Sequence, residues 1–331
     1  MARSQNRHPG PGKASRKGLS IVQLIRKFPD DRTAEDWIAG IRWPGGPVCP
    51  HCDSSNVQCG ARHPSMNYRC RACRKFFSVR SGTVMQHSNL GAQKWVIATY
   101  VLTTGLKGES SMKLHRDLDI TRKSAWHLAH RIRETWDRDD GVFGGPVEID
   151  ETYVGGKRRN MSNARRKELA GTGRGAVGKT AVIGVKDRDT NQVAAQPVES
   201  VNKGTVNEML GESLDRDALA YTDDSAVYED LAHRESVNHS VSEFVRGMAH
   251  TNGIESFWSM LKRGYQGTYH KMSAKHLARY VNEFSGRHNM RMADTLDQME
   301  LTMRRMIGRR LRYRDLVRGN GLKSGARAAA A

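Results

Sequence analysis

Three acidic residues stand where a folded chain could bring them to one site: Asp150, Asp223 and Glu255. Asp150 lies among apolar neighbours in the alternating segment 147–157, and Asp223 ends a short apolar run. A carboxylate among apolar side chains is costly to bury unless its charge is compensated, often by a metal ion. Three carboxylates can hold two divalent ions about 3.5–4 Å apart, which activates water or a hydroxyl for attack on phosphorus. Oxygen ligands favour Mg²⁺ or Mn²⁺.

The third acid opens a predicted helix over residues 251–262. At about 100° per residue, Glu255 and Lys262 fall about 20° apart on the flank of its apolar face. We therefore expect Lys262 to bind a phosphate beside the three acids. The apolar face is predicted from the i, i+3, i+4, i+7 spacing of Ile254, Phe257, Trp258 and Leu261.

Each acid also has an ordinary structural interpretation. Asp150 and Asp223 could be turn residues, and Glu255 could be favourable to its helix dipole. Taken singly, these interpretations are at least as good as the catalytic one. Taken together, they do not explain three acids at such positions in a strongly basic chain. The close competitors for the site are Glu148, Glu151 and Asp224.

The region that carries the acids alternates between strand and helix patterns. Three strands, then a helix and further strands, is the order of a ribonuclease-H-like mixed α/β sheet, and we expect this fold for residues 145–290. Its chemistry would then lie at strand ends and on one adjacent helix. Five strands are predicted: one from Val147, three over 180–186, 192–198 and 218–222, and a short one around Val237. A helix is predicted over 204–214.

Two cysteine pairs, Cys49-Pro-His-Cys52 and Cys70-Arg-Ala-Cys73, have the spacing of a tetrahedral zinc site. We expect Zn²⁺ on these four thiolates. Cys59 and His51 could substitute for a ligand, but the four cysteines suffice. Short zinc ribbons contact either DNA or protein partners, and the spacing does not separate the two.

Residues 88–138 are predicted to form three helices, the last over 121–133. This third helix has one apolar face, and its other face is basic. A helix, a tight turn and a basic helix indicate a helix-turn-helix whose last helix enters the major groove of DNA. The alternative is a three-helix packing unit with a solvated basic face. The apolar positions are Ala125, Leu128, Ala129, Ile132 and Trp136; the basic ones are Arg122, Lys123, His127, His130, Arg131 and Arg133.

The chain has 331 residues, which favours about two domains, and a formal charge of 54 − 35 = +19. Such an excess favours a polyanionic partner. The longest uncharged apolar run, about residues 95–106, is too short to span a membrane, and the basic N-terminus lacks the apolar core of a signal peptide. We therefore expect a cytoplasmic protein without a membrane partner, whose five cysteines are ligands or free thiols.

One motif misleads. Residues 173–180 read GRGAVGKT and match the phosphate-loop pattern G-x-x-x-x-G-K-[ST]. That loop works only between a strand and a helix, where backbone N–H groups meet the phosphate. Here a polar, basic segment precedes it and a β-branched strand follows it. We interpret it as a basic loop without nucleotide binding.

Together, these motifs closely resemble the insertion-sequence transposases of bacteria that have an N-terminal zinc ribbon, related to Merlin transposons. The resemblance rests on the cysteine pairs and on three segments, residues 149–157 (IDETYVGGK), 221–223 (YTD) and 250–258 (HTNGIESFW), and extends over about 20–290. It implies a DDE-type catalytic domain with the acids at Asp150, Asp223 and Glu255. Some relatives carry Asn in the third role, which makes Asn252 the second candidate. Asp224 stands where the family usually has Gly.

The resemblance implies cleavage and strand transfer on DNA, with the terminal inverted repeats and target DNA as partners and a homo-oligomer on paired ends. The alternative is a non-catalytic regulator that binds DNA through the zinc ribbon and helix-turn-helix alone. We expect a disordered basic arm over 1–18, a helical lead-in with the ribbon over 19–85, and a basic helical tail over 291–331 with an apolar stripe. The expected DNA contacts are Arg122, Lys123, His127, Arg131, Lys157 and Lys262.

Overall fold

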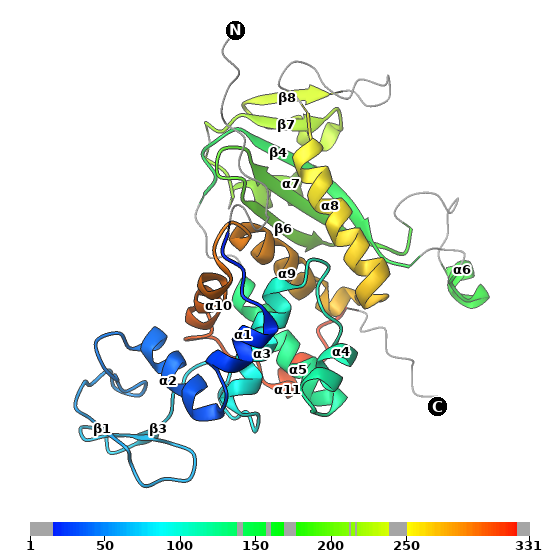
Figure 1. The fold of residues 1–331 in the computed structure, drawn as a ribbon. Helices are drawn as coiled ribbons and strands as arrows, with labels where there is room; N and C mark the ends of the chain where they lie inside the picture. Colours follow the sequence, from blue (N-terminus) through cyan, green and yellow to red (C-terminus); the bar gives the residue numbers. More distant parts are fainter. Residues whose placement is uncertain are drawn as a thin grey trace. The chain divides into compact units, whose positions relative to one another are not determined.

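The computed structural model describes seven stretches of the chain (Figure 1). They form two compact units. The first contains residues up to 136 together with 290–318, and the second contains residues 137–289. The basic arm before residue 16, Lys157 and the first half of the GRGAVGKT segment (173–176) lie outside the described residues. The described residues are 16–137, 142–156, 160–168, 177–211, 213–215, 217–237 and 250–322.

The first unit is a bundle of helices around one apolar core, with the ribbon attached. Trp95, Leu102 and Ile132 are fully buried in this core. Side-chain caps define two helix starts, because Ser20 accepts a hydrogen bond from Gln23 N and Asp30 accepts one from Thr33 N. The helices are α1 (Ile21–Lys27), α2 (Asp31–Arg42), α3 (Ala92–Thr104), α4 (Ser111–Asp117), α5 (Arg122–Arg133), α10 (Thr295–Arg304) and α11 (Tyr313–Val317).

The three helices predicted over 88–138 are confirmed as α3, α4 and α5, and all five predicted apolar positions of the last one are buried. The basic face of α5, which was expected to contact DNA, is not open along its whole length, because His130, Arg131 and Arg133 are buried. The Arg131 guanidinium donates to the carbonyl oxygens of Leu311 and Gln86 at 3.2 and 2.8 Å. A chain segment from the far end of the sequence thus occupies this face of α5.

The segment after residue 290 is part of the first unit. Its predicted apolar stripe is confirmed, since Met299, Met303 and Met306 are buried in the core of α2, α3 and α5. The Trp136 indole also donates to the Thr302 hydroxyl at 3.2 Å. Residues 291–318 therefore complete a core and are no free tail. In the described part of the chain, no helix is long and apolar enough to cross a membrane.

The second unit contains a five-stranded mixed sheet in the order β6-β5-β4-β7-β8. The first three strands pair antiparallel, whereas β4 pairs with β7, and β7 with β8, in parallel. Each predicted strand is found within a few residues. The elements are β4 (Val147–Val154), β5 (Thr180–Asp187), β6 (Val193–Val198), β7 (Ala220–Asp223) and β8 (Arg234–Val237), with α6 (Asn163–Glu168), α7 (Lys203–Gly211), α8 (Asn252–Gly264) and α9 (Leu277–Met290).

Helices cover both faces of this sheet (Figure 1). Apolar residues of α8 and α9 pack with Val154 and Val182 on one face, and those of α7 pack with Ile149 and Ile183 on the other. Side chains alternate along a strand, so Asp150 belongs to the α8 face. This mixed α/β arrangement is consistent with the expected ribonuclease-H-like fold. Thr180, the end of the GRGAVGKT segment, opens β5 and no helix.

Candidate active site and zinc centre

Asp150 and Asp223 lie on neighbouring parallel strands. The β4–β7 ladder pairs Val147 with Ala220 and Glu148 with Tyr221. The same offset, continued along both strands, brings Asp150 level with Asp223. Two acids far apart in the sequence therefore meet at one place on the sheet.

The electrostatics of Asp150 show which other acids are near it. Burial and the negative charges of Glu151, Asp223 and Glu255 together raise the pKa of its carboxyl from 3.8 to about 7. The structure thus brings together the three acids that the sequence singled out, on β4, β7 and α8. Their mutual repulsion is what a bound cation would relieve.

Asp223 is better placed than its neighbour Asp224. The Asp223 carboxylate is half-buried and accepts a hydrogen bond from Ser225 N at 3.2 Å. The Asp224 side chain is 58% exposed and contacts Arg234 and Ser236. The geometry favours Asp223 as the second acid.

Glu255 lies in the first turn of α8. The buried Thr251 hydroxyl donates to its Oε1 atom at 3.0 Å, which orients the carboxylate. Asn252, the second candidate for this role, is the first residue of the helix, and its side chain is exposed. The negative charge of Glu255 contributes to the raised pKa of Asp150.

The start of α8 is fixed to the sheet by Glu148, whose positioning role the sequence did not reveal. Glu148 is 2% exposed and accepts a hydrogen bond from Ile254 N at 2.8 Å. It also pairs with Arg188 Nε at 2.9 Å, and Arg188 donates to the His250 carbonyl oxygen at 2.6 Å. The Glu148–Arg188 pair therefore holds the segment that carries Glu255. Glu148 was visible in the sequence only as a competitor of Asp150, and Arg188 gave no signal.

Two glycines let α8 approach the sheet this closely. A Cβ atom on Gly184, the ladder partner of Asp150, would lie 2.5 Å from the Trp258 ring. A Cβ atom on Gly253 would lie 2.6 Å from Glu148 Oε2. Any larger residue at either position would push the helix, and Glu255 with it, away from Asp150.

The remaining site residues of the sequence analysis divide into three groups. Lys262 is exposed on α8 and lines a cavity beside the acids. Arg122 and Lys123 are exposed at the start of α5 in the first unit. The His127 Nε2–H group donates to the Leu311 carbonyl oxygen, 3.0 Å away, so this ring, like the Arg131 guanidinium, makes a contact within the protein. We accordingly revise the expectation of DNA contact for His127 and Arg131.

The acids fit a pair of divalent cations. They offer only hard oxygen donors, which Mg²⁺ and Mn²⁺ prefer. In the described residues, the only group of three or more potential ligands with all its atoms within 4.8 Å is formed by cysteines, so the carboxylates of the three acids are spread more widely. Bound there, the ions would supply charge stabilisation and an activated oxygen nucleophile.

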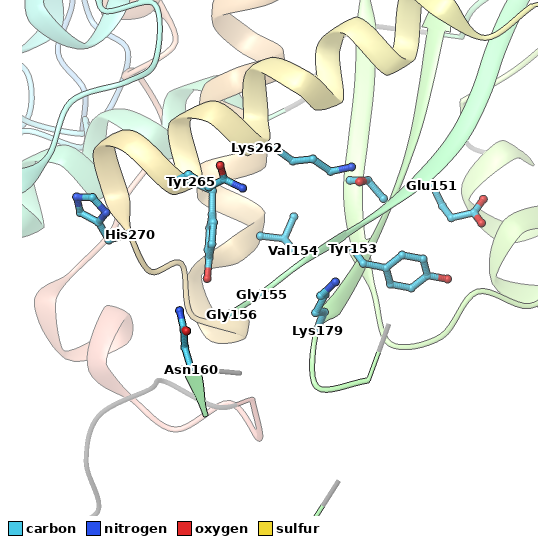
Figure 2. A pocket seen from close by; sticks show the side chains of 12 residues that line it. Glu151, Tyr153, Val154, Gly155, Gly156, Asn160, Lys179, Lys262, Tyr265 and His270 are labelled. Atoms are coloured by element: carbon cyan, nitrogen blue, oxygen red, sulfur yellow. The ribbon is translucent and has the colours of Figure 1, made fainter. Parts of the chain in front are cut away.

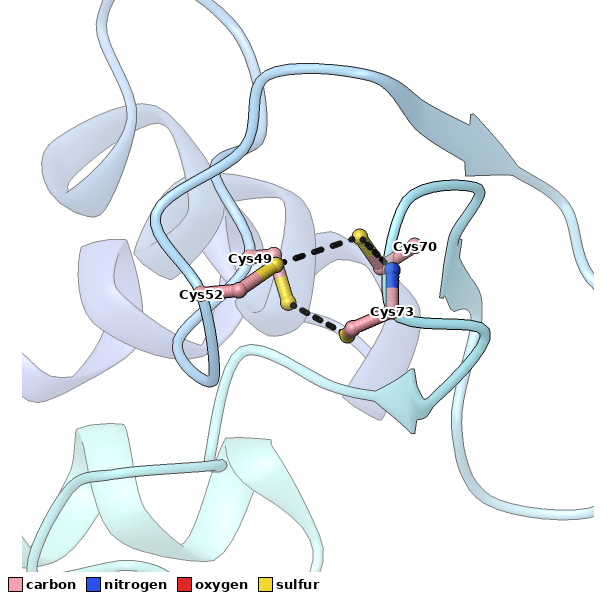
Figure 3. Close-up of side chains that lie close together, drawn as sticks. All are labelled: Cys49, Cys52, Cys70 and Cys73. Carbon is pink, nitrogen blue, oxygen red and sulfur yellow. Dashed lines mark hydrogen bonds between the residues drawn. The ribbon is translucent and has the colours of Figure 1, made fainter.

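The four cysteines Cys49, Cys52, Cys70 and Cys73 form the predicted cluster (Figure 3). The sulfur of Cys49 lies 3.7 Å from that of Cys73, and the sulfur of Cys52 lies 3.6 Å from that of Cys70. Sulfurs 2.3 Å from one tetrahedral zinc ion are about 3.8 Å apart, so the set fits zinc. Cys59 is exposed and outside the cluster.

Each cysteine pair lies in a tight backbone turn whose N–H groups contact the sulfur atoms. Residues Asp53 and Arg74, directly after each pair, have positive φ angles of 56° and 62°. Each tight turn aims a backbone N–H at a sulfur, that of His51 at Cys49 and that of Cys73 at Cys70. The hydrogen bond from Cys73 is the largest of the causes that lower the pKa of the Cys70 thiol to about 6, whereas burial raises the pKa of the Cys49 thiol. The ribbon itself is the small antiparallel sheet of β1 (Val57–Cys59), β2 (Tyr68–Cys70) and β3 (Phe76–Phe77).

We expect the Cys70→Ser variant to lose its zinc and the ribbon to become sensitive to protease. The fully buried apolar cluster of the ribbon consists of Cys49, Cys70 and Phe77 alone, so metal binding must supply most of its folding free energy. Zinc content per chain and limited proteolysis measure this. Cys59→Ser is the matched control and should keep one zinc. Zinc retained in Cys70→Ser, or lost in Cys59→Ser, would refute the assignment.

We expect Asp150→Asn to stabilise the protein when Mg²⁺ is absent. The pKa of Asp150 is about 7 in the folded state against 3.8 unfolded, so the unfolded chain loses this proton first. The contribution of Asp150 to the free energy of unfolding therefore falls as pH rises from about 3.8 to 7. The variant should be more stable by up to about 4 kcal/mol at pH 8, and the difference should narrow toward pH 5. Denaturant unfolding of the wild type and of Asp150→Asn at pH 8 and at pH 5, in buffer without Mg²⁺ and without chelator, tests this. A difference in stability between the two proteins that does not change with pH would contradict it.

We expect Glu148→Gln to weaken Mn²⁺ binding at the acids by about 10–100-fold, the usual loss when a group that orients metal ligands is removed. Gln can still accept from Ile254 N but cannot pair with Arg188, so the start of α8 loosens. The matched control is Glu283→Gln, which breaks the buried Glu283–Arg287 pair on α9 in the same unit. Calorimetric titration of Mn²⁺ should show a loss in the first variant and none in the second. Equal affinities would refute the positioning role of Glu148.

Comparison with known proteins gives independent support for the two parts of the chain. Residues 142–289 match the ISXO2-like transposase domain, and residues 29–76 match the transposase zinc-ribbon domain. An uncharacterised protein in the transposable element ISH50 of Halobacterium salinarum is 29% identical over 272 residues, which cover 78% of this chain and 91% of that protein. This relative is archaeal, so the resemblance is not confined to bacteria. Two segments of this chain are therefore similar to the transposase zinc-ribbon domain and to the ISXO2-like transposase domain.

Proposed function

We propose that this protein is a Mg²⁺-dependent DNA transposase that cuts at the inverted-repeat ends of an insertion sequence and joins them to target DNA. The observation that carries the proposal is the arrangement of the acids: the register of β4 and β7 brings Asp150 level with Asp223, and the charges of Asp223 and Glu255 act on the Asp150 carboxyl. In a protein of charge +19, a cluster of acids that repel one another is explained if the acids bind cations that act on a phosphodiester.

In the proposed reaction, Asp150, Asp223 and Glu255 hold the two Mg²⁺ ions, and Glu148 with Arg188 keeps the last acid in place. Lys262 binds a phosphate near the reacting bond, about two turns along α8 from Glu255. The order of events is hydrolysis at the transposon end, followed by attack of the released 3′-hydroxyl on target DNA. Both steps form one P–O bond and break another at a phosphorus atom, so one set of acids can serve both.

DNA delivery is proposed for the rest of the chain. The excess of basic residues supplies a sequence-independent attraction to phosphates. Arg122 and Lys123, exposed at the start of α5, are the proposed contacts of the helix-turn-helix, and the zinc ribbon is a further candidate. Paired transposon ends imply that more than one copy of the protein acts together, as we expect from the resemblance.

The proposal is tested with a labelled DNA end from the inverted repeats that flank the gene. In the presence of Mg²⁺ we expect nicking and strand transfer by the wild type. Asp150→Ala and Glu255→Ala should each lose about 10³-fold or more, because several kcal/mol of transition-state stabilisation disappear. The matched control is Asp224→Ala, an exposed neighbour, which should keep nearly full activity. All variants should bind the end equally well.

The same assay separates the enzyme from the rival, a regulator that only binds DNA. Wild-type protein that binds the end tightly but neither nicks nor joins it, in Mg²⁺ or Mn²⁺, would favour the regulator. Undiminished cleavage by Asp150→Ala would remove this residue from the site and the metal assignment with it.

A further inference from the structure

A cavity of about 630 Å³ lies in the second unit, between the end of β4, the start of β5 and the last part of α8 (Figure 2). It begins at Glu151, the residue after Asp150. Its volume is within the range of about 300–1,000 Å³ typical of small-ligand sites, so it is far too small for duplex DNA. The groups that matter for its chemistry are Lys179, Lys262, Tyr265, Gln266 and His270.

Two ammonium groups belong to this cavity, one from each side. Lys262 comes from α8 and Lys179 from the residue before β5 (Figure 2). Over the described stretches of the chain, neither has a carboxylate within ion-pair distance. Lys179 is held there by a close approach, since a Cβ atom on Gly155 would lie 3.0 Å from its Cα atom. The cations are therefore available for an anion.

The cavity also has an aromatic wall, made by an interruption of α8. After Gly264 the helix widens into a π-helical turn, Tyr265–Tyr269, and ends at His270 with a positive φ of 56°. Such wide turns are rare and frequent at functional sites. The turn carries Tyr265, whose half-buried ring lines the same cavity as the two lysines (Figure 2).

We propose that this cavity holds one unpaired nucleotide of the DNA strand that enters the active site, with its phosphate between Lys179 and Lys262 and its base against Tyr265. The inference rests on the proposed function. Two cations match a phosphate, and an aromatic ring offers a sequence-tolerant surface for a base. The four residue-to-residue steps from Asp150 to Val154 span about 13 Å, so the nucleotide lies within a few positions of the reacting bond.

The proposal predicts that unpairing one particular nucleotide in advance strengthens binding, because the protein no longer has to break that base pair. Single mismatches are moved one position at a time along the DNA end, on both sides of the cleavage site. Affinities of the wild type are measured without Mg²⁺. We expect one position to bind about tenfold more tightly when mismatched, and the others to change little.

Variants assign that gain to the cavity. Tyr265→Ala should abolish the gain, whereas Tyr265→Phe, which keeps the ring, should retain it. Lys179→Gln should reduce the gain in affinity. The matched control is Lys203→Gln, which should leave the gain unchanged; Lys203 is an exposed lysine at the start of α7, and it forms an ion pair with Glu229. Unchanged thermal unfolding of each variant shows that its fold is intact.

The outcomes distinguish this inference from the proposed function. Protein that cleaves the end with Mg²⁺ but shows no favoured mismatch, or whose gain survives Tyr265→Ala, overturns the cavity assignment alone. Protein that neither binds nor cleaves the end overturns both proposals.

Discussion

The second unit depends on one unfavourable interaction, the crowding of acidic groups around Asp150. Burial and the charges of Glu151, Asp223 and Glu255 all act against ionisation of this carboxyl. A fold gains nothing from such a group by itself, and replacing it would stabilise the chain. The presence of this carboxyl is explained if the site holds cations, because functional sites commonly lower the stability of the fold.

Keeping Glu255 near this repulsive centre requires a mechanical support, which the structure provides in α8. The Glu148 carboxylate accepts from the first turn of the helix and pairs with Arg188, which in turn holds the preceding carbonyl. Gly184 and Gly253 remove the side chains that would otherwise keep the helix at a distance. An apolar face, packed on the sheet through Phe257 and Trp258, supplies the burial that offsets the repulsion.

Local patterns in the sequence were sufficient to predict much of the fold and of the candidate site. The strand and helix order, the four zinc ligands and the three acids all follow from spacing and alternation, which depend on near neighbours in the chain. The basic face of α5 was misjudged because Leu311, which accepts from Arg131, comes 180 positions later in the sequence. The role of Glu148 was missed for the same reason, since its partners Arg188 and Ile254 are distant in sequence. No periodicity records such contacts.

The central claim is that Asp150, Asp223 and Glu255 together hold divalent metal ions. Crystals of the protein soaked in Mn²⁺ test it most directly, through the anomalous scattering of the metal. We expect anomalous peaks between these three carboxylates in wild-type crystals. Crystals of Asp150→Asn treated in the same way should show no peak at that place. A peak coordinated by Asp224 or Glu151 in place of Asp223 and Glu255, or no peak near Asp150 at saturating Mn²⁺, would contradict it.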